Sequence, residues 1–177
     1  IGDSFEVEMH AGEAYELIVN SFGLKIPLAD KGMGSIQAML LILRLAVVIF
    51  KKQSNDRLNN ISKPEEGKPY IVIIEEPELN LHPALQSKLA DLFHNVFDIY
   101  KIRLIIETHS EYLIRKTQIL VKTKEYEIQP NENPLAVLYF DKDLKQWNMG
   151  YREDGRFKES FGEGFFNESS NLTFELL

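Results

Sequence analysis

The sequence predicts an α/β fold in which a parallel sheet is flanked by helices. Two continuous apolar runs, residues 70–74 and 104–106, are rich in β-branched residues, which is typical of strands buried on both faces of a parallel sheet. Each run is followed by a segment whose apolar residues recur at helical spacing. The order strand–helix–strand–helix favours a right-handed crossover between two parallel strands.

Length and composition are those of an ordinary globular domain. The chain has 177 residues, of which 44% are hydrophobic and 27% charged, enough to bury a sizeable core. A net charge of −7 argues against nucleic acid bound over the whole surface, although it is compatible with a local basic patch. The absence of cysteine excludes disulfides and thiolate metal sites and fits a cytoplasmic protein. No basic-then-apolar leader follows Ile1, so we expect no signal peptide and a piece of a longer protein.

The first third of the chain predicts two strands and a long helix. Residues 15–19 and 24–28 are short apolar runs separated by a turn at 20–23. A glycine-bearing loop, residues 30–35, then leads into a helix that starts near Ser35. The apolar run 36–50 is shorter than the roughly 20 residues of a membrane span and contains Arg44, so we expect a buried core helix and no membrane partner. The polar residues 51–69 predict an exposed loop, either an insertion or a partner site.

The second half predicts two more helices and an antiparallel pair of strands. Pro83 opens a helix, where its missing N–H has no consequence, and Ser110 is a good N-cap for the next helix. Residues 135–140 and 147–151 are expected to pair antiparallel, and the tail has no clear period. The apolar face of the first of these helices consists of Leu85, Leu89, Leu92, Phe93 and Val96.

Charged residues follow both predicted parallel strands. Glu75 and Glu76 end the first strand, and Glu107 and His109 end the second. The carboxyl ends of parallel strands share one edge of a sheet, where ligands of open α/β sheets bind. One acid could hold Mg²⁺ through its water shell, the other could orient an attacking water, and a neutral imidazole could bond a phosphate oxygen. The acid pair alone is equally typical of two solvated side chains at a strand end.

These residues resemble motifs of a known family. Residues 75–83, Glu-Glu-Pro-Glu-Leu-Asn-Leu-His-Pro, resemble the Walker B motif and D-loop of ABC-type ATPases in the SMC-like, RecF-like and OLD-like branch, and residues 107–110 resemble the switch-histidine loop. The resemblance implies that Glu75 associates with Mg²⁺, with Glu in place of the more common Asp. It further implies that Glu76 is the catalytic glutamate and His109 the γ-phosphate sensor. Asn80 and His82 would lie in the D-loop, which approaches a partner head.

The glycine loop gains a meaning from the same resemblance. Residues 32–37 are similar to a divergent ABC signature motif, which contacts the ATP held by the opposite subunit. Gly32, Gly34, Ser35 and Gln37 are its candidate binding residues, since glycines and a helix N-terminus let backbone donors approach a phosphate. Considered alone, this segment is typical of a turn and helix cap.

The Walker A motif is missing from the sequence. No stretch fits Gly-x-x-x-x-Gly-Lys-[Ser/Thr]. We therefore expect residues 1–150 to form the C-terminal half of an ABC-type head, a partial P-loop NTPase-like domain, and residues 151–177 an extension. The implied cofactors are ATP and Mg²⁺, and the implied partner is a second copy of the head, arranged head to tail.

Three functions fit these observations. The first is ATP hydrolysis by a dimer that acts on DNA in repair, chromosome maintenance or phage defence, with the isolated chain inactive for want of Walker A. The second is a non-catalytic scaffold with a degenerate nucleotide site. The third is a metal-dependent nuclease that uses Glu75, Glu76 and Glu107 as ligands.

Overall fold

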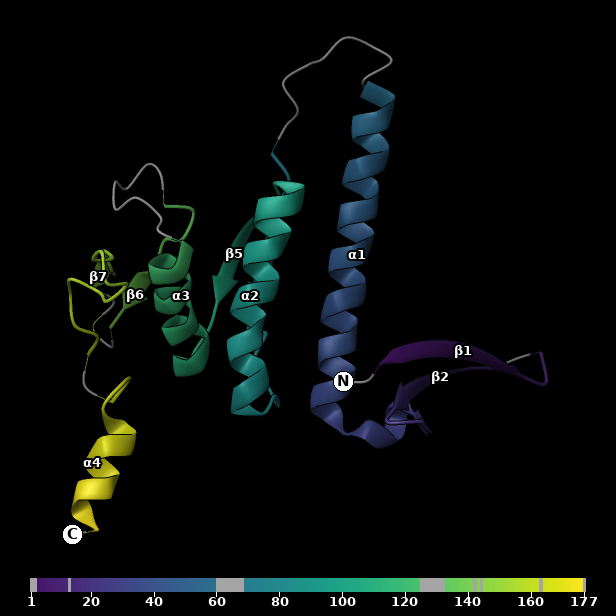
Figure 1. Ribbon diagram of the computed structural model, residues 1–177, viewed down its shortest axis with the longest axis horizontal. Helices are drawn as coiled ribbons and strands as arrows, with labels where there is room; N and C mark the ends of the chain where they lie inside the picture. The colour runs from purple at the N-terminus through teal and green to yellow at the C-terminus, as the bar shows by residue number, and fades with distance from the viewer. Residues whose placement is uncertain are drawn as a thin grey trace. The chain divides into compact units, whose positions relative to one another are not determined.

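The chain divides into two compact units in a computed structural model (Figure 1). The structure describes residues 3–12, 14–59, 69–124, 133–141, 143, 145–162 and 164–176. The first unit is Ile1–His109 and the second is Ser110–Leu177. The predicted boundary at residue 150 stays a prediction.

The first unit begins with an antiparallel sheet of three strands in the order β1-β2-β3. The strands are β1 (Ser4–His10), β2 (Ala14–Ser21) and β3 (Leu24–Pro27). The predicted pair is confirmed as β2 and β3, whereas β1 was not expected. Its seven residues alternate strictly between polar and apolar, which is typical of a strand. They pair with β2 in the register from Ser4↔Asn20 to His10↔Ala14.

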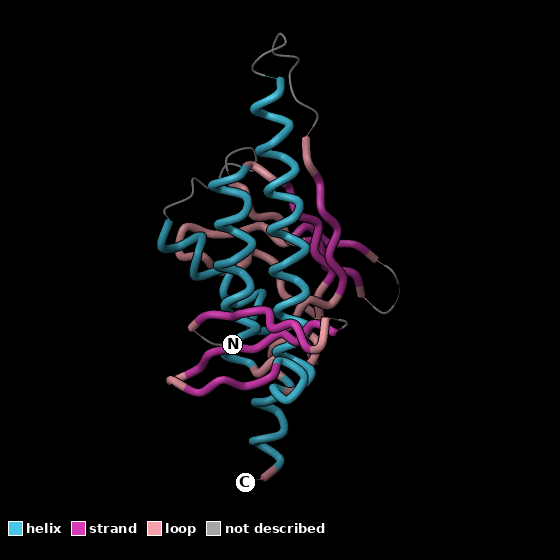
Figure 2. The backbone as a smooth tube through the Cα atoms, turned by 90° about the vertical axis from the view of Figure 1, so that its right-hand side faces the viewer, coloured by secondary structure: helices cyan, strands magenta, loops and turns pink. Residues whose placement is uncertain are grey.

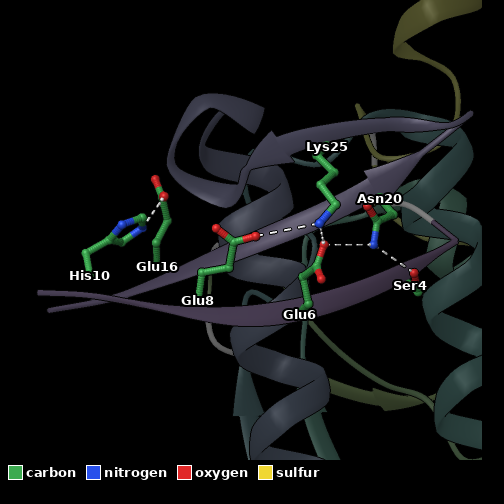
Figure 3. Close-up of polar contacts among 7 residues, drawn as sticks. All are labelled: Ser4, Glu6, Glu8, His10, Glu16, Asn20 and Lys25. Carbon is green, nitrogen blue, oxygen red and sulfur yellow. Dashed lines mark hydrogen bonds and ion pairs between the residues drawn. The ribbon is translucent and has the colours of Figure 1, made fainter. Parts of the chain in front are cut away.

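One face of this sheet carries a small polar network (Figure 3). Lys25 Nζ lies 2.6 Å from Glu6 Oε1 and 3.6 Å from Glu8 Oε1, and Asn20 donates to Ser4 Oγ at 3.1 Å. The hydrogen bond from Lys25 lowers the pKa of Glu6 and raises that of Lys25. All these groups are solvent-exposed or nearly so, so their contribution to stability is small.

A single long helix follows the sheet. A 3-10 turn, η1 (Leu28–Lys31), leads into α1 (Met33–Asn59), which is uninterrupted (Figures 1 and 2). Val19, Leu28 and Met39 form a small core where β2, η1 and α1 meet. The helix starts two residues before the expected Ser35, within the usual uncertainty of a helix end.

Two expectations about α1 were wrong. The loop predicted for residues 51–69 is helical up to Asn59, and the Lys52–Asp56 ion pair at 2.6 Å has the i,i+4 spacing that supports a helix; residues 60–68 lie outside the described residues. The helix is also not buried by the residues that the structure describes: Phe50 is 70% exposed and Leu40 49%. An apolar helix is buried only where neighbouring elements cover it, and among the described residues the buried apolar side chains of α1 are Ala38, Met39 and Leu45.

The predicted parallel pair and its crossover helix are confirmed. Strands β4 (Ile71–Glu75) and β5 (Arg103–Glu107) run parallel in the register Ile71↔Arg103 to Glu75↔Glu107. Helix α2 (Pro83–Tyr100) connects them and begins at Pro83 as expected. On its predicted apolar face Leu89, Phe93 and Val96 are buried.

The two strands are not buried on both faces, contrary to expectation. Their exposure alternates, with Ile73 68% exposed and Ile105 56% exposed, whereas Val72 and Leu104 are partly covered. The described residues supply only two strands to this sheet. They cover one face of the sheet and leave the face that carries Ile73 and Ile105 exposed. Continuous apolar runs are typical of strands that are covered on both faces, and the described residues cover only one.

The second unit contains α3 (Glu111–Lys124), β6 (Leu138–Phe140), β7 (Gln146–Asn148) and α4 (Glu168–Glu175). Ser110 Oγ accepts the Leu113 N–H at 3.1 Å, which confirms the predicted cap, and β6 pairs antiparallel with β7. Aromatic rings pack beside this pair, with the Tyr139 and Phe161 centroids 5.0 Å apart. Helix α4 was not predicted for the tail.

Candidate functional site

The ends of β4 and β5 are joined by one more backbone hydrogen bond beyond the strands. The Glu76 N–H donates to the Glu107 carbonyl oxygen at 3.0 Å. The chain then leaves the sheet at once, because Glu76 adopts a left-handed conformation with φ of 44°. Such a backbone is costly for a non-glycine residue and is often found at functional sites. The turn holds the Glu76 side chain at the carboxyl edge of the sheet.

Three side chains come together at this edge. His109 Nε2 lies 3.0 Å from Glu107 Oε1 and 4.0 Å from Glu76 Oε1. One ligand atom from each of the three lies within 4.8 Å of the others. The His109 side chain is 77% exposed and both carboxylates are about half exposed. An acid and an imidazole are thus available together, in contact with solvent, where a water could be held between them.

Glu75 lies next to this group without belonging to it. It is the last residue of β4 and the register partner of Glu107. Its side chain is exposed, yet its carboxylate is not one of the three atoms that converge. The structure therefore brings Glu76 and His109 together as expected, adds Glu107, and leaves Glu75 at the side.

Glu78 is the residue that sequence analysis missed. The residue is buried, with a relative exposure of 9%, and its Oε1 accepts the backbone N–H of His109 at 2.6 Å. Its Oε2 is buried and has no hydrogen-bond partner among the described residues. The available signal was a third acid, placed after Pro77, in a segment that otherwise looked like an exposed turn.

The predicted D-loop contacts the predicted signature motif, residues 32–37, in the same chain. Asn80 Nδ2 donates to Gln37 Oε1 at 3.1 Å. At Gly34 the two backbones approach so closely that an added Cβ would lie 2.3 Å from the Asn80 carbonyl oxygen. Asn80 itself is left-handed, with φ of 59°, a conformation that asparagine tolerates better than most residues. The glycine loop is therefore a packing surface as well as a candidate phosphate-binding loop.

The remaining predicted residues have local structural roles. The Gly32 carbonyl accepts the N–H of Ser35 at 3.1 Å, so Ser35 lies in the first turn of α1. His82 is the N-cap of α2, where its Nδ1 accepts the Ala84 N–H at 3.2 Å. These contacts are compatible with nucleotide binding and do not by themselves point to it.

The donor set suits a hard divalent cation and a phosphate chain. Carboxylate oxygens of Glu75, Glu76 and Glu107 are the ligands that Mg²⁺ prefers. Their place at the carboxyl edge of a parallel sheet is where such folds bind nucleotides. His109 adds a group able to hydrogen-bond a phosphate oxygen or a water.

A comparison with protein families now identifies the domain. The family model described as "AAA ATPase domain" matches residues 3–114, which is more than half of the chain. The chain belongs to the AAA ATPase domain family. The match spans the N-terminal sheet, α1, both parallel strands and the first residues of α3.

One solved structure shows the same fold as this AAA ATPase domain chain. It comes from work described as "Structural biochemistry of ATP-driven dimerization and DNA stimulated activation of SMC ATPases". The two chains are 8% identical and align with a TM-score of 0.53 over 99% of this chain and 81% of the other. No curated protein sequence matches. The predicted P-loop NTPase-like α/β fold is confirmed, and the chain has an AAA/SMC-like ATPase architecture.

Membership of the AAA ATPase domain family also bears on α1. Residues Met33–Arg57 form a helix long and apolar enough to cross a membrane by length and composition, and its most apolar 18-residue stretch has a mean hydropathy of 2.1. The family match includes this whole helix. We therefore treat α1 as an element of the ATPase domain whose apolar surface is only partly covered.

Proposed function

We propose that this protein hydrolyses ATP with Mg²⁺. The observation that carries the proposal is the convergence of Glu76, Glu107 and His109 at the carboxyl edge of the β4–β5 pair, in a domain of the AAA ATPase family. Phosphoryl transfer needs a positioned water and neutralised phosphate charge more than covalent chemistry. An exposed acid beside an imidazole supplies the first requirement.

Each residue of the edge has a proposed part. Glu76 orients and polarises the attacking water, and His109 hydrogen-bonds the terminal phosphate. Glu75 and its neighbours would hold Mg²⁺, in part through water, and the ion would neutralise charge on the phosphates. Glu107, 3.0 Å from His109 Nε2, orients the imidazole.

The complete site is proposed to form between two copies arranged head to tail. In that arrangement Gly32, Gly34, Ser35 and Gln37 of one copy face the ATP held by the other, and Asn80 and His82 lie at the junction. Support comes from the fold shared with an SMC ATPase whose description names ATP-driven dimerization. The isolated 177-residue chain should turn over little ATP, because its sequence has no Walker A lysine.

DNA is the proposed target of this ATPase. We expect it to act in the cytoplasm, in a role such as repair, chromosome maintenance or phage defence. The support is the same shared fold, since the description of that SMC ATPase names DNA-stimulated activation. A rise in the ATPase rate of the full-length protein on adding duplex DNA would agree with this target, and an unchanged rate would argue for another.

Substitution of Glu76 tests the proposed reaction directly. In the full-length protein we expect Glu76→Gln to lower kcat by at least about a hundredfold, because the amide cannot polarise the water. ATP-dependent dimerisation, measured by light scattering, should persist because the amide keeps the shape of the side chain. Glu153 is exposed, so Glu153→Gln is the matched control and should hydrolyse ATP at the wild-type rate. Turnover by Glu76→Gln at the wild-type rate would remove Glu76 from its role, and no nucleotide affinity in the wild type would favour a scaffold.

The three converging ligand atoms also favour a second candidate, a metal-dependent nuclease. Two carboxylates and an imidazole within 4.8 Å could hold a divalent ion, with His109 among the ligands in place of Glu75. Cleavage of DNA by the full-length protein with Mg²⁺ or Mn²⁺ and without ATP would support this candidate. ATP turnover without any DNA cleavage under these conditions would exclude it.

A further inference from the structure

We propose that Glu78 is a positioning residue that holds the switch-histidine loop in place through the backbone of His109. The inference rests on the proposed ATPase function for its kinetic consequence. The carboxylate of Glu78 accepts the backbone N–H of His109 and not a proton of its imidazole. Glu78 therefore acts on His109 through the main chain.

The geometry ties two loops together at one atom. Glu78 lies in the turn that follows β4, and His109 follows the end of β5, so the contact spans 31 residues of sequence. At 2.6 Å the bond from the His109 N–H to Glu78 Oε1 is short. With the Glu76 N–H to Glu107 carbonyl bond, it gives the two strand ends reciprocal connections, one in each direction.

The turn that carries Glu78 is itself closely determined. The Leu79 N–H donates to the Glu76 carbonyl at 3.1 Å, and the Leu81 N–H donates to the Glu78 carbonyl at 3.0 Å. Left-handed residues at Glu76 and Asn80 bracket the segment. A buried side chain on a turn with these constraints has little freedom, so it can fix the loop that it contacts.

The burial of Glu78 points to function more than to stability. One carboxylate oxygen is bonded, while the buried Oε2 has no partner among the described residues. A buried oxygen without a donor opposes folding, and this offsets what the bond to His109 contributes. An alanine here should therefore fold, while the loop carrying His109 loses its anchor.

The kinetic test compares three forms of the full-length protein. We expect Glu78→Ala to lower kcat about tenfold, with a change in KM of less than about twofold, because the loss falls on the orientation of His109. Glu78→Gln should keep most of the wild-type kcat, since its amide oxygen can still accept the His109 N–H. Equal impairment of both variants, or a rise in KM alone, would overturn the proposal.

A second measurement does not depend on turnover. Amide hydrogen exchange at His109, in nucleotide-free full-length protein, should be about tenfold faster in Glu78→Ala than in the wild type and unchanged in Glu78→Gln. Glu78→Asp keeps the charge but shortens the reach, so it should behave as the alanine variant and replaces it if that variant does not fold. If the wild type fails to hydrolyse ATP, the proposed function fails, while the exchange rates still decide the role of Glu78. Unchanged exchange in Glu78→Ala and Glu78→Asp would refute it.

Discussion

Tyr151, at the residue scale, shows how a buried hydroxyl is satisfied in the second unit. Its O–H donates to Thr117 Oγ1 at 2.7 Å, and the Thr117 hydroxyl donates in turn to the Ile114 carbonyl at 2.7 Å. The threonine has one proton and gives it to Ile114, so the tyrosine must supply the other. Burial raises the pKa of Tyr151 to about 12, because the phenolate would lose its hydration.

Replacing Tyr151 with phenylalanine should therefore change stability in a pH-dependent way. At neutral pH, Tyr151→Phe should cost about 1 kcal/mol of unfolding free energy through the lost hydrogen bond. The folded protein holds the tyrosine proton more tightly than the unfolded chain, so this residue's contribution is complete below pH 10 and is lost as pH rises towards about 12. Urea unfolding should show the advantage of the wild type shrinking over that range. An advantage that stays constant would show that Tyr151 titrates normally.

Sequence patterns could predict which residues gather at the site but not how they touch. Glu76 and His109 were predictable partners, because adjacent parallel strands end at one edge. The contact from Glu78 to His109 was not, since it depends on the left-handed turn at Glu76. No periodicity encodes that turn. The direction of Glu75 follows from strand alternation up to the end of β4, and only the departure of the chain at Glu76 lies beyond that pattern.

At the scale of elements, the N-cap of α2 is a histidine whose side chain bonds the first turn of the helix. His82 accepts the Ala84 N–H at Nδ1, and Pro83 follows at the first helical position. Histidine is an unusual N-cap, and asparagine, aspartate and serine are the preferred ones. The same residue lies in the segment that resembles a D-loop, so cap and interface roles need to be separated.

Two substitutions at His82 separate them. We expect His82→Ala to lower the unfolding free energy by about 1 kcal/mol, as other lost caps do, and His82→Asn to match or exceed the wild type because it keeps an acceptor. Thermal unfolding measures this. A His82→Asn variant as unstable as His82→Ala would show that the cap contributes nothing. A stable His82→Asn with reduced ATPase activity in the full-length protein would assign the imidazole a role at the dimer junction.

Strong periodicity predicted elements well, and weak or mixed composition did not. The helix from Pro83 and the strands β4 and β5 follow from long apolar patterns. Strand β1 alternates between polar and apolar residues and pairs with β2, and the end of α1 lies in a polar stretch that contains one i,i+4 ion pair. Helix α4 has little apolar periodicity from which it could be predicted. Polar composition hid the end of α1 and helix α4, whereas the alternation of β1 was a local signal of a strand.

For the molecule as a whole, apolar surface and net charge oppose one another. Exposed apolar side chains lie on the N-terminal sheet, as at Met9 and Tyr15, on α1, as at Phe50, and on the β4–β5 pair, as at Ile73. Patches of this kind favour association. A net charge of −7 at pH 7 keeps copies apart by repulsion.

The isolated chain should therefore self-associate as its charge is removed. We expect the mass measured by light scattering to rise as the pH is lowered from neutral towards the isoelectric point near 5.2. Added salt at neutral pH should act in the same direction by screening the repulsion. A mass that stays constant under both changes would show that the apolar surfaces are covered in solution.

The two glycines at the start of α1, Gly32 just before the helix and Gly34 in its first turn, carry different evolutionary constraints. Gly32 has φ of 80° and ψ of 158°, a region open almost only to glycine, so no change elsewhere can make another residue comfortable there. Gly34 is limited by the Asn80 carbonyl, and a shift of that neighbouring segment could make room. Among relatives, position 32 should be invariant, whereas a larger residue at position 34 should co-vary with changes around position 80.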